Sequence, residues 1–262
     1  GRAVFSRIAA DRTRLDALRQ MAAAQSPAHR AQAAVLLAAM LTPAELVREI
    51  ARSETDGIAC QVYVASLLAP GEEPGSAAGP DNPARYPRPP RLRGIAAADL
   101  RAAAGRLAAD PDWRVRYAAV DLLAAAGDAV LPPSHIALAR DSAWPVRSHA
   151  IEALGAYAST GALAMARACI AQGDPVRLDD RLAALHAFAR AGAWDDVMGA
   201  FADSAPDVQY AAVGIMLAAF GFPPAVRAAL PAQVRHLSDR RARSAARDLV
   251  RRLDEETRGS TP

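Results

Sequence analysis

The stretch that decides the fold is DPDWRVRYAAVDLL, from Asp110 to Leu123, together with DSAWPVRSHAIEAL, from Asp141 to Leu154. The second stretch follows the first at a constant offset of 31 residues, without a gap. Both contain an aspartate, a tryptophan and a Val-Arg pair in the same order, followed by matching apolar residues. Self-similarity at such an interval indicates an architecture of similar units that stack on one another.

The matched residues are spaced as one stripe of an α-helix. Counted from the arginine of each Val-Arg pair, the shared residues stand at positions 0, +3, +4 and +7, which lie on one helix face. A small alanine at +3 lets a neighbouring helix approach closely, and a larger residue at +7 fills the space beyond it. Four further groups keep this spacing, the last of them more weakly: Gln209, Ala212, Val213 and Met216; Arg181, Ala184, Leu185 and Phe188; Arg243, Ala246, Arg247 and Val250; Arg30, Ala33, Ala34 and Leu37.

Shorter helical patterns lie between these copies, at 132–140, 160–172, 194–202 and 223–235. Glycines separate the patterns and act as stop or turn signals, at Gly127, Gly173, Gly192 and Gly221. Turns with Asp, Ser or Pro precede the longer helices and suit an N-cap followed by a first helical turn. The predicted unit is therefore a pair of antiparallel helices, and because one pair cannot bury its apolar face alone, neighbouring pairs must stack.

These features resemble HEAT repeats, including the short bacterial form related to phycobilin-lyase repeats. In that family an aspartate in the turn between the helices precedes a Val-Arg pair at the start of the second helix, as Asp110 precedes Val115 and Arg116 here. The resemblance covers residues 96–253 and is weak for residues 1–69. It implies an all-α fold, a HEAT-like α-solenoid of antiparallel helix pairs with a curved binding surface, and no particular activity.

The chain is predicted to contain N-terminal helical repeats over 1–68, a Pro/Gly-rich segment over 69–94, the main repeat array over 95–256 and a tail over 257–262. The segment 69–94 contains seven prolines and cannot be helical. One interpretation is a flexible linker, and another is a long insertion that folds back over the repeats. A third is a segment of polyproline character that binds a partner.

The composition excludes several classes of protein. An apolar fraction of 52% with a net charge of +3 is incompatible with a disordered chain, and two cysteines cannot build a disulfide framework. No apolar run is long enough to cross a membrane, and charged residues interrupt the N-terminal stretch where a signal peptide would be apolar. The sequence therefore predicts a cytoplasmic protein that does not bind membranes.

An arginine column runs through the repeats at position 0, formed by Arg116, Arg147, Arg181 and Arg243, with Gln209 in the fourth slot. Such a column can bind phosphates or acidic peptides. The family resemblance implies a structural role instead, in which each arginine bonds to the turn aspartate of its own or the adjacent repeat. The aspartates available for this ladder are Asp110, Asp141 and Asp207, and the ladder is expected to be weaker at Gln209.

Trp113 and Trp144 occupy equivalent positions just before the second helix of consecutive units. Buried packing between repeats is one role for them, and a partly exposed aromatic pair that anchors a partner is the other. Tyr117 and Tyr210 are also equivalent to each other, and the same two roles apply to them.

The sequence predicts no catalytic residue, no metal site and no cofactor. The histidines and cysteines lack metal-ligand spacing, and no Gly-rich phosphate loop is present. The stretch from Trp194 to Met198 is similar to the Trp-Asp-x-Val-Asp stretch of HEAT-like DNA glycosylases for alkylated bases. Met198, however, stands at the position of the catalytic aspartate. Asp195 and Asp196 also suit the first turn of a short helix, where acidic side chains are favourable.

The leading functional hypothesis is a non-enzymatic scaffold or adaptor that binds a protein or peptide on the solenoid surface. Its candidate contacts are Arg116, Arg147, Arg181, Arg243, Trp113 and Trp144. The alternative is a nucleic-acid-binding protein related to the alkylated-base glycosylases but without the catalytic aspartate. Residues 235–258 contain eight arginines, which fit either a nucleic-acid patch or the solvated outer face of a terminal repeat.

Overall fold

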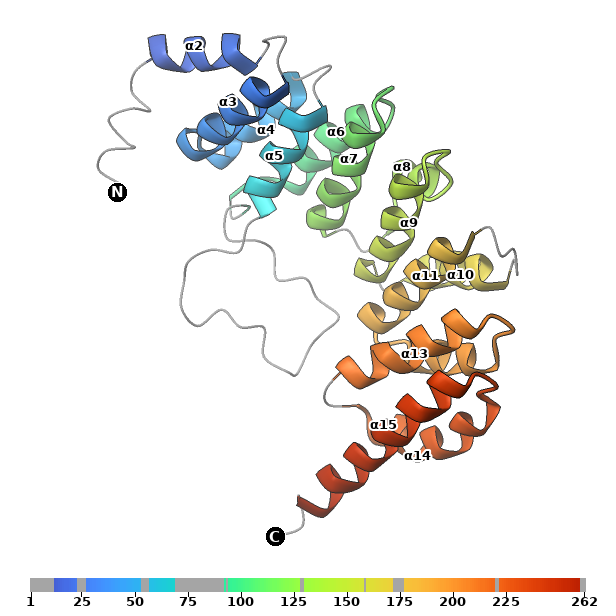
Figure 1. The fold of residues 1–262 in the computed structure, drawn as a ribbon. Coiled ribbons are helices and arrows are strands. Elements are labelled where there is room, and N and C mark those ends of the chain that lie inside the picture. The colour runs from blue at the N-terminus through green and yellow to red at the C-terminus, as the bar shows by residue number, and fades with distance from the viewer. Residues whose placement is uncertain are drawn as a thin grey trace. The chain divides into compact units, whose positions relative to one another are not determined.

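The computed structural model describes residues 12–22, 27–52, 57–68, 92, 94–127, 130–157, 159–171, 177–219 and 222–259. All regular elements within these ranges are helices (Figure 1). The helices form two compact units: unit 1 contains the described residues up to Ala150, and unit 2 contains those from Ile151 onward. The predicted all-α fold of HEAT-like helix pairs is confirmed.

Unit 1 is built from helix pairs in two layers. In one layer α5 packs between α3 and α7, in the other α4 packs against α6, and α2 packs on α3. The bounds are α2 Arg12–Ala22, α3 Pro27–Met40, α4 Pro43–Arg52, α5 Gly57–Leu68, α6 Ala97–Leu107, α7 Trp113–Ala126, α8 Pro133–Leu138 and α9 Trp144–Ala153. Helix α9 crosses the boundary between the units, and its residues up to Ala150 belong to unit 1.

Unit 2 repeats the same two-layer arrangement. Helix α13 packs between α11 and α15 in one layer, α12 packs against α14 in the other, and α10 packs on α11. The bounds are η2 Leu154–Ala156, α10 Thr160–Ala171, α11 Leu178–Ala191, α12 Trp194–Gly199, η4 Ala200–Ala202, α13 Pro206–Ala218, α14 Pro224–Gln233, η5 Val234–His236 and α15 Arg240–Gly259. The four shorter patterns predicted from the sequence correspond to α8, to α10, to α12 with η4, and to α14 with η5.

Local sequence signals explain where the longer helices begin and end. The Asp112 side chain accepts a hydrogen bond from the backbone N–H of Arg114 at 2.9 Å and so caps the start of α7. Helices α7 and α11 end before Gly127 and Gly192, which both have a φ of 70°. These two predicted stop signals are confirmed, and the other two lie outside the described residues, at Gly173 and Gly221.

The helical stripe predicted from the repeats forms the core. Every alanine at +3 is fully buried, namely Ala33, Ala119, Ala150, Ala184, Ala212 and Ala246. The larger +7 residues are buried as well, except for the half-buried Val250. Gly155 shows how closely the elements approach, because a Cβ there would collide with the carbonyl oxygen of Ala187 in α11.

Within unit 1 the helices on either side of the Pro/Gly-rich segment pack together. Helix α5 lies against α7, and a Cβ on Gly57 would come within 2.9 Å of the Arg114 Cβ. The weakly matching N-terminal helices are therefore continuous with the repeats that follow. The predictions for 69–94 themselves fall almost entirely outside the described residues, which resume at Leu92 and Gly94.

Candidate functional site

The arginine column has a fixed place in the helix pairs. Each of its members is the fourth residue of its helix: Arg116 in α7, Arg147 in α9, Arg181 in α11, Gln209 in α13 and Arg243 in α15. At this position a long side chain can reach both the turn before its own helix and the turn of the following pair.

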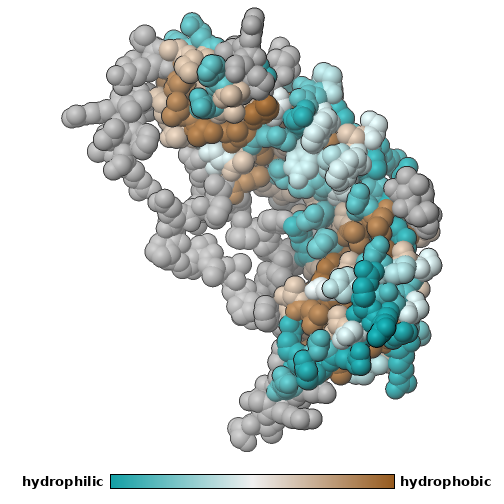
Figure 2. Space-filling model, in the orientation of Figure 1, coloured by the Kyte–Doolittle hydropathy of each residue, from teal (hydrophilic) through white to brown (hydrophobic). Residues whose placement is uncertain are grey.

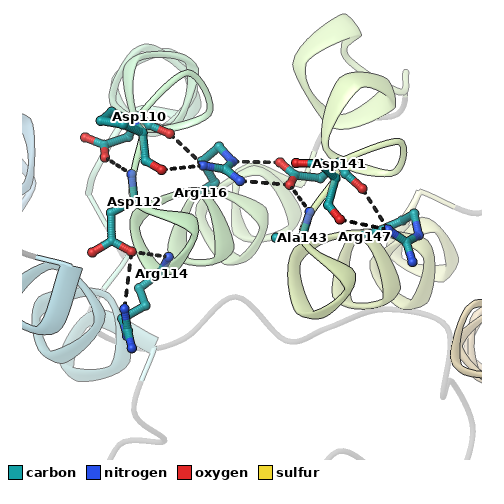
Figure 3. Close-up of polar contacts among 9 residues, drawn as sticks. Asp110, Asp112, Arg114, Arg116, Asp141, Ala143 and Arg147 are labelled. Atoms are coloured by element: carbon teal, nitrogen blue, oxygen red, sulfur yellow. Dashed lines mark hydrogen bonds and ion pairs between the residues drawn. The ribbon is translucent and has the colours of Figure 1, made fainter.

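Arg116 joins two turns of unit 1 through a bidentate ion pair (Figure 3). Its Nε and Nη2 donate to the two carboxylate oxygens of Asp141 at 2.7 and 2.8 Å, and its Nη1 donates to the carbonyl oxygens of Asp110 and Pro111 at 2.8 and 2.9 Å. The hydrogen bonds from Arg116 hold the pKa of Asp141 below its ordinary value, and those from Asp141 raise the pKa of Arg116. One side chain thus fixes the start of α7 relative to the turn before α9.

Asp141 carries the link onward. Its Oδ1 also accepts from the backbone N–H of Ala143 at 2.8 Å, and its carbonyl oxygen accepts from Nη1 of Arg147 at 2.8 Å (Figure 3). Arg147 therefore holds its own turn in the way that Arg116 holds the turn at Asp110. The ladder implied by the family resemblance is present here.

In unit 2 the acidic partner differs from the one expected. Arg181 pairs with both carboxylate oxygens of Asp203, and both side chains are almost fully buried. Asp207, the expected partner, instead binds the exposed Arg241 at 2.9 Å. Asp203 holds its turn as Asp141 does, because its Oδ1 accepts from the backbone N–H of Ala205 at 2.7 Å.

Gln209 maintains the link between turns by neutral hydrogen bonds. Its Nε2 donates to the carbonyl oxygen of Asp203 at 2.6 Å and to the Ser238 hydroxyl at 2.8 Å. Its Oε1 accepts from the backbone N–H groups of Ser238 and Asp239 at 3.0 and 2.9 Å. Gln209 is only 1% exposed, so it replaces the arginine with a saturated network and leaves no gap in the ladder.

The two tryptophans of unit 1 differ in how much of the side chain is exposed to solvent. Trp113 is half-buried, with the Arg114 guanidinium 4.8 Å from its ring centroid. Trp144 is 59% exposed at the first position of α9, so buried packing is wrong for this residue. Beside them Tyr117 stacks on His149 with ring centroids 4.0 Å apart, and the His149 Nε2 lies 2.7 Å from Oδ1 of Asp121.

Part of the chain that contains this ladder matches a known protein family. The family model for HEAT repeats matches residues 100–189, which run from within α6 to within α11. This stretch consists of HEAT repeats. A search of curated proteins gave no match. HEAT repeats commonly serve as scaffolds for protein interactions. The matched stretch contains Trp144 and the column members Arg116, Arg147 and Arg181, and Gln209 and Arg243 lie beyond it.

Beyond the matched HEAT repeats, the glycosylase-like stretch serves packing in unit 2. Trp194 is buried and meets the Phe222 ring edge-on at 5.1 Å between centroids, and Met198 is buried as well. Asp196 pairs with Arg167 at 2.7 Å. The tryptophan that would face a damaged nucleotide therefore lies in the core.

The described residues contain no cluster of His, Cys, Asp or Glu that could hold a metal ion. Among the helices of the described part, none is both long and apolar enough to cross a membrane. Sequence reasoning missed two residues of the ladder, Asp203 and Ser238. The spacing of six residues from Asp110 to Arg116, and again from Asp141 to Arg147, identifies Asp203 as the turn residue that belongs to Gln209.

Proposed function

We propose that this chain is a protein-binding scaffold whose partner docks on the face of unit 1 around Trp144. Trp144 carries the proposal, because a tryptophan that is 59% exposed leaves a large apolar ring in water. Tryptophan is also the residue type most enriched at the energetic centres of protein interfaces. A partner that covers this ring removes apolar surface from water at a position already held by the helix.

The surroundings of Trp144 have the mixed character of an interface. Trp113 and Tyr117 offer further aromatic surface from the neighbouring α7, and both are half-buried. Arg114 is exposed beside Trp113, and the His149–Asp121 pair adds polar groups at the edge. An apolar centre with a polar rim is the usual anatomy of a protein-binding patch.

The arginine column supports this face by positioning it. Arg116 and Arg147 use their guanidinium groups to hold the turns before α7 and α9. Trp113 and Trp144 are the first residues of those two helices, so their separation depends on the Arg116–Asp141 link. A side chain held on rigid elements loses less entropy when it binds, and this favours recognition.

The test starts from a pull-down with the full chain, with and without nuclease, at about 100 and about 500 mM salt. A protein recovered in every condition is then purified, and its affinity is measured against the wild type and Trp144→Ala. We expect the substitution to weaken binding at least about tenfold, since hot-spot truncations exceed about 2 kcal/mol. Tyr210→Ala is the matched control, because Tyr210 is a 47% exposed aromatic of unit 2.

Equal affinity of wild type and Trp144→Ala would reject this docking face. Recovery of nucleic acid that is lost at the higher salt would instead favour the nucleic-acid alternative, because phosphate contacts weaken steeply with salt.

A further inference from the structure

Helix α15 has the buried face of a repeat helix and an unusual outer face. Its inner face is formed by Ala242, Ala246, Leu249 and Leu253, all buried. Two of its arginines are used to hold it on α13: Arg252 donates to the carbonyl oxygens of Leu217 and Ala219 at 2.5 and 2.8 Å, and Arg241 pairs with Asp207. These contacts fix the orientation of the rest of the helix.

Four other arginines of α15 are exposed, and they gather on the side opposite the buried stripe: Arg240, Arg243, Arg247 and Arg251. The last three are spaced four residues apart, which places them one above the other on a helix. Among the described residues, Arg240 and Arg247 make no hydrogen bond or ion pair, whereas Arg251 donates to the Asp248 carboxylate of the same helix at 2.8 Å. Figure 2 shows hydrophilic side chains gathered over the C-terminal helices of unit 2 on the visible face.

Arg243 stands at the ladder position, and its surroundings differ from those of the earlier ladder arginines. Its Nη1 lies 3.5 Å from the carbonyl oxygen of Leu237, a longer version of the Arg116 contact with its own turn. Arg116 and Arg181 each also bind a turn carboxylate six residues before the next column member, Asp141 and Asp203. In the described residues no carboxylate takes that place for Arg243.

Arg247 gives an independent observation at the +4 position. The residues at +4 in the other second helices with this spacing are aliphatic and fully buried: Val120, Ile151, Leu185 and Val213. In α15 this position is an exposed arginine. An apolar neighbour would leave this cation desolvated and unpaired, so whatever covers this face must supply negative charge.

We propose that the outer face of α15 binds an acidic segment of a partner protein that presents carboxylates at helical-turn spacing. Arg243 and Arg247 are the contacts, with Arg243 taking a carboxylate as Arg116 takes Asp141. Carboxylate is favoured over phosphate because it is the group that this side-chain position binds elsewhere in the chain, through a bidentate guanidinium pair. This site lies on unit 2 and goes beyond the docking face proposed around Trp144.

The test measures fluorescence anisotropy of a labelled alanine-based helical peptide with aspartate at every fourth position, titrated with the full chain. A peptide with asparagine in place of aspartate is the uncharged control. We expect the acidic peptide to bind and the double variant Arg243→Gln/Arg247→Gln to bind it at least about tenfold more weakly, as expected for the loss of charge-assisted hydrogen bonds. Arg106→Gln, which removes an exposed arginine of α6, should bind like the wild type.

Three results would overturn the proposal: no difference between the aspartate and asparagine peptides, full affinity in the double variant, or an equal loss in Arg106→Gln. The same titration with single-stranded DNA and with inorganic polyphosphate separates the alternatives. Tighter binding of the DNA or of the polyphosphate than of the acidic peptide at equal salt would also overturn the proposal and assign the face to phosphate. Circular dichroism checks that each variant keeps the helix content of the wild type, which we expect because none of the substituted residues belongs to a buried face.

Discussion

Arg116 in unit 1 and Gln209 in unit 2 occupy the same position in their helices, yet they bind the following turn differently. Arg116 reaches a carboxylate, Asp141, which in turn holds the backbone N–H of Ala143. Gln209 reaches the backbone N–H groups of Ser238 and Asp239 directly. Both side chains also donate to a carbonyl oxygen of their own turn.

The turn that follows explains the difference. Where unit 1 has Asp141, the corresponding position before α15 is Leu237, which is buried. A guanidinium at 209 could not accept from the two N–H groups that now donate to Oε1 of Gln209, whereas an amide offers both an acceptor and a donor. The residue at each column position therefore matches the hydrogen-bonding groups of the next turn: arginine stands opposite a carboxylate, and glutamine stands opposite backbone N–H groups.

The largest effect is expected where the ladder pair is most deeply buried. Arg181→Ala leaves the Asp203 carboxylate buried without its cation, which costs about 3–5 kcal/mol. Native-state hydrogen exchange of α11 and α13 measures this loss. Arg167→Ala is the matched control, because the Arg167–Asp196 pair is bidentate but its arginine is half exposed, and we expect a much smaller loss of stability. Equal losses in the two variants would show that burial does not govern the ladder.

The second prediction concerns the stability of unit 1 at low pH. It distinguishes the effect of the buried His135 from that of the Arg116–Asp141 ion pair. Burial lowers the pKa of His135 to about 4, although its Nε2–H donates to the carbonyl oxygen of Ala150 at 2.7 Å. The unfolded chain therefore binds a proton that the folded chain does not, and unit 1 loses about 3 kcal/mol as the pH falls from about 6.5 to about 4. Hydrogen exchange of α8 and α9 against pH measures this loss.

His135→Gln is the control for the acid effect, since its amide can still donate to Ala150 and does not titrate. We expect this variant to keep only the smaller loss that begins below about pH 5, where carboxylates with a lowered pKa, such as Glu45 and Asp141, take up protons in the unfolded chain. Arg116 holds the pKa of Asp141 below its ordinary value, so the ladder contribution is complete above about pH 5 and begins to fall only as the unfolded chain takes up a proton at this carboxylate. An undiminished slope in His135→Gln would assign the acid sensitivity to another group.

The core and the helix pairs could be predicted from the sequence because they follow from a helical period. Alanine at +3 is buried in every copy, because the stripe to which it belongs faces the neighbouring helices. The resemblance to HEAT repeats implied the ladder, but it did not identify the partner of Arg181. Asp207 lies closer to the Val208–Gln209 pair, while only the six-residue spacing from turn to column identifies Asp203.

The spacing of the repeats could not predict how exposed each tryptophan is. Trp113 and Trp144 have the same place in the repeat, yet one is half-buried and the other is 59% exposed. Burial at a helix start depends on what the neighbouring elements place beside it, and a repeat pattern contains no information about that. The same limit applies to Gln209, whose four hydrogen bonds involve a serine of the next turn that is outside the repeat pattern.

The smallest effect is expected when Arg116 is replaced by glutamine, the residue found at the equivalent position 209. In Arg116→Gln the new amide can still reach the carbonyl oxygen of Asp110, but its oxygen faces the Asp141 carboxylate, whereas the oxygen of Gln209 accepts from backbone N–H groups. The loss of the bidentate pair should cost about 2 kcal/mol. Arg114→Gln on the same helix removes an exposed arginine 3.6 Å from Asp112 and should cost below about 0.5 kcal/mol.

An NMR titration adds a readout that packing does not affect: the pKa of Asp141 should rise in Arg116→Gln and stay unchanged in Arg114→Gln, because the hydrogen bonds from Arg116 are the main cause of its lowering. If the pKa of Asp141 did not rise, the matching of column residue to turn carboxylate would fail.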